Sequence, residues 1–205
     1  MKNALRWIDY YLSKESNSIN SLGRHEVDNF IGLLTTALTK ERNIFVIGNG
    51  GSASNASHFA TDLGKGASDA LEKEGLNRFH VLSLTDNVSW ITALGNDYSF
   101  DRIFTDQLKS IAIPGDVLIG ISVSGTSPNL MHAFKFANSL GMTTVALTGL
   151  KKNKENIGTL SDLWVESKDT HYGVVEDSQM VILHAICYYF MENAKEVARI
   201  LKEEL

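Results

Sequence analysis

The sequence predicts an α/β protein built on a parallel β-sheet with helices on both faces. Short apolar runs alternate with longer segments of helical periodicity across residues 41–170, which is typical of strands joined by crossover helices. Two of these runs, 44–47 and 117–121, are apolar along their whole length, as expected for strands that are covered on both faces. Because ligands of such sheets lie beyond the carboxyl ends of the strands, we expect the functional site there.

The first part of the chain is expected to form two helices, a strand and a third helix. Apolar residues recur at helical spacing in both halves of residues 1–40, which indicates a helical pair. The strand over 44–47 ends in the glycine-rich turn of residues 48–51. Ser52 can cap the helix that follows, because its side-chain oxygen can accept a hydrogen bond from the first turn.

The rest of the chain is expected to add four strands and a long C-terminal helix. Residues 65–77 are charged and contain glycine, so we interpret them as an exposed connection. Gly141 is expected to close the helix before the fourth strand, and one long helix is expected from Val174 to the end of the chain. We expect one domain over 1–205, with N-terminal helices (1–40), an α/β core (41–170) whose later strands cover 79–83, 117–121, 143–147 and 163–165, and a C-terminal helix (171–205).

The composition and charge of the chain argue against several classes of protein. The chain has 205 residues and a net charge of −5, and its Lys and Arg residues are scattered, which argues against a nucleic-acid partner. The one dense basic run, residues 151–154, is interpreted as a solvated helix start. Cys187 is the only cysteine, so no intrachain disulfide can form, and its apolar neighbours favour a buried structural thiol. Without a signal peptide or a long apolar span, we expect a cytosolic protein with no membrane partner.

Residues 48–52, the first loop, join the first strand to a helix. Their glycines let backbone N–H groups approach an anion, although a tight turn without a ligand would look the same. Gly48 to Ala53 also fits the dinucleotide fingerprint, which requires an acidic residue about twenty positions further on. The second strand ends only at Ser83, with Asp86 beyond it, and the lysine of a P-loop is missing. We therefore expect no nucleotide cofactor.

Residues 122–127, the second loop, crowd four hydroxyl groups into one strand–helix turn. Hydroxyls and backbone amides together can bind three phosphate oxygens without a cation, and a neutral site suits a sugar phosphate that must be released after each turnover. A serine-rich capped turn is the alternative for this loop alone, but two such loops in one chain favour an anion site. The hydroxyl groups belong to Ser122, Ser124, Thr126 and Ser127, around Gly125.

Four stretches of the chain, taken together, resemble the SIS (sugar isomerase) domain, with the phosphoheptose isomerases as the most similar subgroup. The C-terminal helix with His184 also matches, so the resemblance covers essentially the whole chain. The four stretches are GNGGSASNASHFATDL (48–63), LGNDYSFDRIF (94–104), PGDVLIGISVSGTSPN (114–129) and GMTTVALTG (141–149).

The resemblance implies both a fold and an activity. The expected fold is a five-stranded parallel sheet of the flavodoxin-like SIS type, usually assembled as a homotetramer with active sites between subunits. The expected reaction is the isomerisation of sedoheptulose 7-phosphate to D-glycero-D-manno-heptose 7-phosphate, which feeds heptose synthesis for surface polysaccharides. Several members of the family carry zinc in the site, so zinc is the expected metal.

The resemblance also assigns roles to individual residues. The catalytic glutamate of the family corresponds to the shorter Asp62, the site histidine on the first loop helix to His58, the glutamine of the last helix to Glu176, and the later histidine to His184. Asp62, His184 and Glu176 are thus the catalytic candidates, and the same three with His58 are the metal candidates. The substrate-binding candidates are Asn49, Gly50, Gly51, Ser52, Asn96, Asp97, Ser122, Ser124 and Ser127.

The spacing of the ionisable residues restricts these roles. His58 and Asp62 are four apart on a predicted helix and share one face, which suits a metal pair, an acid–base pair or an ordinary helical contact. His184 lies among apolar residues, where a lone histidine is usually part of the core. Glu176 and His184 are about 12 Å apart on a straight helix. Either Glu176 lies in an irregular helix start, or the two act in one site from different subunits.

Two departures from the family pattern keep other functions open. Gly173 stands where the family has an aspartate, and Gly66 stands where it has a basic residue after the catalytic acid. We expect an aldose–ketose isomerase, in which Asp62 removes a proton from carbon and His184 is its acid–base partner. Glu176 is the alternative base, because Asp62 is one methylene shorter than glutamate. The other functions are isomerisation of a different sugar phosphate, a non-catalytic module that binds a phosphosugar or a protein, and a structural oligomer.

Overall fold

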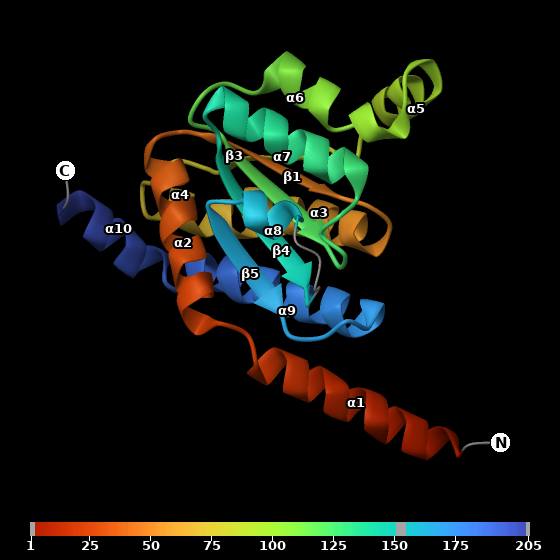
Figure 1. The fold of residues 1–205 in the computed structure, drawn as a ribbon. Helices are drawn as coiled ribbons and strands as arrows, with labels where there is room; N and C mark the ends of the chain where they lie inside the picture. The colour runs from red at the N-terminus through yellow and green to blue at the C-terminus, as the bar shows by residue number, and fades with distance from the viewer. Residues whose placement is uncertain (1–2, 151–154, 204–205) are drawn as a thin grey trace.

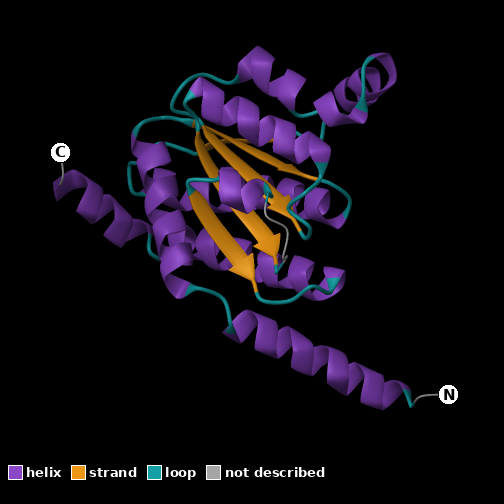
Figure 2. Ribbon diagram, in the orientation of Figure 1, coloured by secondary structure: helices purple, strands orange, loops and turns teal. Residues whose placement is uncertain are grey.

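The computed structural model describes residues 3–150 and 155–203, and shows a five-stranded parallel sheet between two layers of helices (Figures 1 and 2). The predicted fold class is thereby confirmed. The basic run 151–154, interpreted as a helix start, lies outside the described residues. In the order β2-β1-β3-β4-β5, the strands are β1 (Asn43–Gly48), β2 (His80–Ser83), β3 (Val117–Ser122), β4 (Thr143–Gly149) and β5 (Leu163–Ser167).

The helices divide between the two faces of the sheet. Side chains of β1 alternate, so that Ile44 and Val46 join the core under α2, α3, α4, α9 and α10, while Phe45 and Ile47 join the core under α5 to α8. The helices are α1 (Ala4–Asn20), α2 (Arg24–Thr39), α3 (Gly51–Thr61), α4 (Ser68–Lys73), α5 (Val88–Asp97), α6 (Thr105–Ile111), α7 (Pro128–Leu140), α8 (Ile157–Leu160), α9 (Tyr172–Glu192) and α10 (Ala194–Glu203), with a π-helix η1 (Asp62–Ala67) and a 3₁₀ turn η2 (Phe100–Arg102).

The register of the central strands brings the two glycine- and serine-rich loops together. Gly48, the last residue of β1, pairs with Ile121 of the neighbouring β3, and the loop after each strand therefore starts at the same edge of the sheet. Every residue of β3 is buried. The buried pairing of β1 with β3 therefore fixes where both loops start.

The expectation of an exposed connection over 65–77 is wrong. The helical path continues through η1 and α4, because Ala67 and Leu71 are fully buried against the core that contains Phe59. The charged residues of this segment occupy only its outer side and hide the helical periodicity of the sequence.

The expectation of one long helix from Val174 to the end is also wrong. The helix α9 ends at Glu192, and Asn193 adopts φ −111° and ψ 19° while its Nδ2 donates to the Tyr189 carbonyl at 3.0 Å. An asparagine side chain can satisfy a helix-end carbonyl in this way. The chain then turns into α10, whose Val197 is buried in the core.

The first helix, α1, packs on α9 and extends away from the sheet toward the N-terminus (Figure 1). Its inner side is anchored by the buried hydroxyl of Ser18, which accepts a hydrogen bond from Ser178 at 2.8 Å. Within the described residues, no helix is long and apolar enough to cross a membrane. Much of the remaining surface of α1 is apolar and exposed, at Leu5, Trp7, Ile8, Tyr10 and Leu12.

Candidate active site

The first loop (48–52) turns sharply from β1 into α3. A Cβ atom on Gly48 would lie 2.5 Å from the Ser52 carbonyl oxygen, and Gly50 has a φ of 56°, so the turn requires glycine at both positions. Helix α3 begins at Gly51, and Ser52 is nearly fully buried in its first turn. The unpaired N–H groups of a helix start, aimed beyond the sheet edge, are suited to bind an anion.

The second loop (122–127) leads from β3 into α7 and orients its hydroxyls through local hydrogen bonds. The Gly125 N–H donates to Ser122 Oγ at 3.0 Å, and the Thr126 N–H donates to Ser124 Oγ at 3.2 Å. Ser127 is the N-cap residue of α7, but its side chain makes no capping hydrogen bond. Its hydroxyl is therefore not used by the helix and can serve a ligand.

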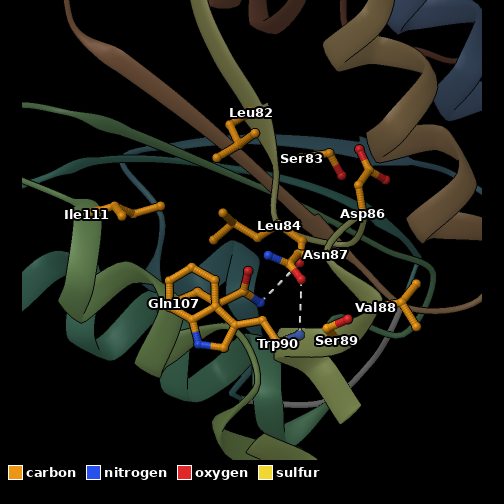
Figure 3. A pocket seen from close by; sticks show the side chains of 10 residues that line it. All are labelled: Leu82, Ser83, Leu84, Asp86, Asn87, Val88, Ser89, Trp90, Gln107 and Ile111. Atoms are coloured by element: carbon orange, nitrogen blue, oxygen red, sulfur yellow. Dashed lines mark hydrogen bonds between the residues drawn. The ribbon is translucent and has the colours of Figure 1, made fainter. Parts of the chain in front are cut away.

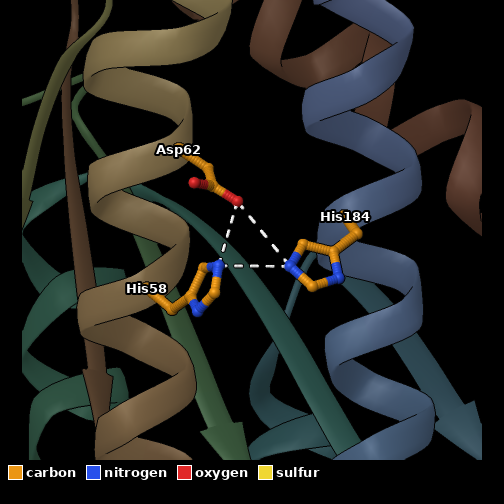
Figure 4. A group of neighbouring side chains, drawn as sticks. All are labelled: His58, Asp62 and His184. Carbon is orange, nitrogen blue, oxygen red and sulfur yellow. Dashed lines mark hydrogen bonds and ion pairs between the residues drawn. The ribbon is translucent and has the colours of Figure 1, made fainter.

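His58, Asp62 and His184 meet where α3 and α9 lie side by side (Figure 4). His58 Nε2 is 3.2 Å from Asp62 Oδ2, His184 Nε2 is 3.7 Å from the same oxygen, and the two Nε2 atoms are 3.1 Å apart. The three side chains are partly exposed, so a solute can reach them. We call this group the His–Asp–His cluster.

The cluster has the chemistry of a metal site and of an acid–base site. Its three ligand atoms lie within 4.8 Å of one another, which allows them to hold one metal ion. Two imidazole nitrogens 3.1 Å apart can form a hydrogen bond only if one is protonated and the other is not, so the pair can also share a movable proton.

The π-helix η1 positions Asp62, its first residue. The wider turn of a π-helix changes the usual pairing of the backbone, and side chains from outside supply partners here. Ser68 Oγ donates to the Leu63 carbonyl at 2.9 Å and accepts the Phe79 N–H at 3.0 Å, while Arg78 Nη2 donates to the Gly64 carbonyl at 3.1 Å. Sequence reasoning missed these supporting residues, and the close pair Gly64 and Gly66 was the only local sign of an unusual turn.

Glu176 lies apart from the cluster, against the first loop. A Cβ atom on Gly51 would be 2.5 Å from both carboxylate oxygens of Glu176, so the carboxylate rests directly on that glycine. Asn55 Nδ2 also donates to the Glu176 carbonyl at 3.0 Å. Burial raises the pKa of the Glu176 carboxyl, and the neighbouring Asp177 raises it further.

The position of Glu176 answers one question from the sequence. Helix α9 is continuous from Tyr172 through Glu192 and contains both Glu176 and His184. An irregular helix start is therefore not available to bring these two side chains together. Binding of one metal ion by both side chains would need Glu176 and His184 from different subunits.

Asn96 and Asp97 occupy the last turn of α5, which lies at the rim of the molecule (Figure 1). Both are exposed, and Asn96 Nδ2 donates to Asp97 Oδ1 at 2.9 Å. Asn49 of the first loop is hydrogen-bonded to Asn129. Gly50 and Gly51 form the turn into α3.

The two departures from the family pattern are filled by other side chains. At Gly173 a Cβ atom would overlap the hydroxyl of Tyr11, and at Gly66 it would overlap the terminal methyl of Met191. A side chain at either position would have to displace the end of Met191 or of Tyr11. Cys187 is buried, as predicted, and burial raises its pKa to about 12.

A separate pocket of about 570 Å³ lies beside β2, between α5 and α6 (Figure 3). The Trp90 indole stands over it, and Gln107 Nε2 donates to the Leu84 carbonyl at 3.1 Å at its base. No lining residue belongs to the predicted site. The lining residues are Leu82, Ser83, Leu84, Asp86, Asn87, Val88, Ser89, Trp90, Gln107 and Ile111.

Comparison with known proteins gives consistent matches over this architecture. The SIS domain family model matches residues 11–149. The phosphoheptose isomerase of Syntrophotalea carbinolica is 34% identical over 184 residues, which cover 88% of this chain and 90% of that protein. The phosphoheptose isomerase of Aliarcobacter butzleri is 40% identical over 150 residues, which cover 73% and 76%. The solved phosphoheptose isomerase from Neisseria gonorrhoeae superposes with a TM-score of 0.80 at 27% identity, covering 92% of this chain and 98% of that one.

Proposed function

Since the chain belongs to the SIS domain family, we infer that it is an aldose–ketose isomerase of a sugar phosphate, of the phosphoheptose isomerase type. We propose sedoheptulose 7-phosphate as the substrate and D-glycero-D-manno-heptose 7-phosphate as the product. The proposal is supported by relatives that bear the phosphoheptose isomerase name and by a site that combines an anion grip with acid–base groups.

One observation carries the proposal: Ser52, at the proposed phosphate end of the site, and His58 of the His–Asp–His cluster lie on the same helix, α3. Ser52 and His58 are six positions apart, which corresponds to about 9 Å along the helix axis. A seven-carbon chain phosphorylated at its far end can span this separation, whereas a triose phosphate cannot. The geometry therefore favours a long substrate with its carbonyl end at the cluster.

The phosphate is proposed to lie between the two loops. Backbone N–H groups at the start of α3 would bind its oxygens from one side, and the hydroxyls of Ser122, Ser124 and Ser127 from the other. None of these donors carries a full charge. Release of the product therefore does not require a tight ion pair to be broken.

The isomerisation is proposed to use Asp62 as the base. The Asp62 carboxylate would remove a proton from C1 of the ketose to form an enediol, and a proton delivered to C2 would then give the aldose. The His184 Nε2 atom is 3.7 Å from Asp62 Oδ2 and 3.1 Å from His58 Nε2. His184 would move a proton from the hydroxyl oxygen on C1 of the substrate to the oxygen on C2. His58 would orient the pair and set which nitrogen of His184 is protonated.

The cluster also fits zinc. Zinc bonds to imidazole nitrogen and carboxylate oxygen are about 2.0–2.2 Å long, so two ligands of a tetrahedral ion lie roughly 3.3 Å apart. The separations of 3.1, 3.2 and 3.7 Å between the ligand atoms of His58, Asp62 and His184 are close to that value. Bound there, zinc would polarise the substrate carbonyl and stabilise the charge that develops on oxygen.

Glu176 is proposed to contact the substrate near the first loop. Its carboxylate lies on Gly51, where the phosphate and the adjoining carbons would pass. Burial and the neighbouring Asp177 raise the pKa of Glu176, and its carboxyl group offers hydrogen-bonding oxygens to the substrate at this point. Asn96 and Asp97 stay predicted substrate contacts.

We propose a homotetramer with active sites between subunits. The exposed apolar residues of α1, among them Trp7 (54% exposed) and Leu12 (60% exposed), offer a surface for a second copy. Sedimentation of the protein tests the assembly. A Trp7→Glu/Leu12→Glu variant that is monomeric and fully active would refute the requirement for an interface.

The deciding experiment is the isomerisation of sedoheptulose 7-phosphate, with and without added zinc, by the protein and its Asp62→Asn variant. We expect kcat to fall by about 10²–10⁴ in the variant, the usual contribution of a general base. Asp28→Asn, an exposed aspartate on α2, is the matched control and should keep full activity. Substrate binding without turnover by the unmodified protein would instead indicate a phosphosugar-binding module.

A further inference from the structure

We infer that Asn129 is a positioning residue of the active site, which holds the first and second loops at a fixed separation through a reciprocal amide pair with Asn49. The inference rests on the function proposed above, because it assumes that both loops bind one phosphate. Asn129 lies outside both loops, in the first turn of α7, and is almost fully buried.

The amide pair is closed in both directions. Asn49 Nδ2 donates to Asn129 Oδ1 at 2.9 Å, and Asn129 Nδ2 donates to Asn49 Oδ1 at 2.9 Å. Asn129 Oδ1 also accepts the Leu130 N–H at 3.0 Å, which ties the pair to the start of α7. Asn129 is only 1% exposed, so water does not reach its side chain, and loss of these hydrogen bonds costs free energy.

The pair joins two segments that are otherwise tied to different neighbours, the second loop by backbone hydrogen bonds from Gly149 to the Val123 carbonyl and from Ile157 to the Gly125 carbonyl. Strand pairing between β1 and β3 ends at Gly48 and Ile121. Beyond that point, within residues 3–150 and 155–203, no other side-chain hydrogen bond links residues 49–52 to residues 123–129. The loops consist mainly of glycine and serine, which provide few apolar contacts that could fix their spacing.

Only an amide at each position can make this pair. Each side chain must donate through nitrogen and accept through oxygen, as asparagine does. An aspartate at position 129 would keep the accepting oxygen but would place a second oxygen against Asn49 Oδ1. An alanine would remove both hydrogen bonds and leave the Asn49 amide free to turn.

The separation of the loops decides how many donors reach the phosphate at once. A displacement of about 1 Å between groups that act together can cost a hundredfold in rate or binding. The cluster on α3 and α9 does not depend on Asn129, because its residues lie beyond the first turn of α3. Loss of Asn129 should therefore weaken phosphate binding and leave the chemical step nearly intact.

The test measures inorganic phosphate binding by calorimetry, and KM and kcat for sedoheptulose 7-phosphate, in Asn129→Ala, Asn49→Ala and the double variant. We expect the phosphate Kd and the KM to rise about tenfold in Asn129→Ala, with kcat within about threefold of the unmodified protein. The double variant should be no weaker than the weaker single variant, because both changes break the same pair.

The control is Asn138→Ala, at the other end of α7. Asn138 also makes two side-chain hydrogen bonds, to the Leu160 carbonyl and from Thr144 Oγ1, but it lies far along the helix from both loops. This variant should lose stability without losing phosphate affinity, which separates positioning from a general structural role. Asn129→Asp, which keeps the oxygen that accepts the Leu130 N–H but cannot donate to Asn49 Oδ1, serves if Asn129→Ala does not fold.

Two results would overturn the inference in distinguishable ways. An unmodified protein that binds neither phosphate nor the sugar phosphate overturns the proposed function and the inference together. A protein that binds phosphate, with an Asn129→Ala variant within twofold of it or no weaker than Asn138→Ala, overturns the role of Asn129 alone.

Discussion

Replacement of Ser68 by alanine should destabilise the protein strongly, although Ser68 contacts no proposed ligand. Its hydroxyl is fully buried, donates to the Leu63 carbonyl at 2.9 Å and accepts the Phe79 N–H at 3.0 Å. Alanine leaves the Phe79 N–H buried without this partner, at about 1–3 kcal/mol, whereas the Leu63 carbonyl still accepts the backbone N–H of residue 68. The expected loss is therefore about 1–3 kcal/mol. For a protein of this length that corresponds to a decrease in Tm of about 2–12 °C.

The assay is urea unfolding followed by circular dichroism, together with a calorimetric Tm. Ser110→Ala is the control, because the exposed Ser110 also donates to a carbonyl one turn back, that of Asp106 at 3.2 Å, and its loss should cost less than about 0.5 kcal/mol. If Ser68→Ala also lost less than about 0.5 kcal/mol, the hydroxyl would not be what holds the π-turn.

The same variant should lower activity, because the π-turn begins at Asp62. A relaxed turn would move the Asp62 carboxylate relative to His184 on the other helix. A shift of about 1 Å can cost a hundredfold in kcat. The Ser68→Ala protein could be less stable and still retain full kcat below its unfolding temperature. That result would show that α3 alone positions Asp62.

Two further predictions concern buried ionisable groups. Both carboxylate oxygens of Glu15 on α1 are buried without a hydrogen-bond partner, and burial, followed by the nearby Asp177, raises the pKa of Glu15. Because the pKa of Glu15 is raised in the folded state, its charged form disfavours folding. Glu15→Gln should therefore raise the free energy of unfolding by about 1 kcal/mol at pH 8 and change it little at pH 4, as measured by urea unfolding. Equal effects at both pH values would contradict this. Burial raises the pKa of Cys187 to about 12, so a thiol reagent at pH 8 should modify it only in urea, and rapid labelling of the native protein would contradict its burial.

Much of the sheet could be predicted because its central strands are short apolar runs bounded by turns. Burial on both faces of β1 and β3 leaves no polar position in the middle of either strand, and this signal depends on nothing else in the chain. The loops that follow were equally readable, because glycine and serine at a strand–helix junction restrict the local conformation. The local sequence was sufficient to predict both the central strands and the two loops.

The remaining features depend on contacts between distant residues. The periodicity of α4 is hidden by its charged outer face, and only the burial of Leu71 against the core shows that it is a helix. At the break, the Tyr189 carbonyl accepts hydrogen bonds from both the backbone N–H and the side-chain Nδ2 of Asn193. The meeting of His184 with His58 joins residues 126 positions apart, and the contact of Glu176 with Gly51 joins residues of α9 and the first loop. No local pattern encodes these distances.

The two glycines that replace charged residues of the family are both packed against other side chains of this chain. Gly66 and Gly173 lie on separate helices, and in each case another side chain, from Met191 or Tyr11, occupies the space where a Cβ atom would be. A single substitution that restored either charge would therefore have to displace the end of that neighbour. Because Tyr11 belongs to α1, the start of α9 is packed by the same helix that carries the exposed apolar surface. A larger side chain at position 173 would thus act on the docking of the first helix through Tyr11.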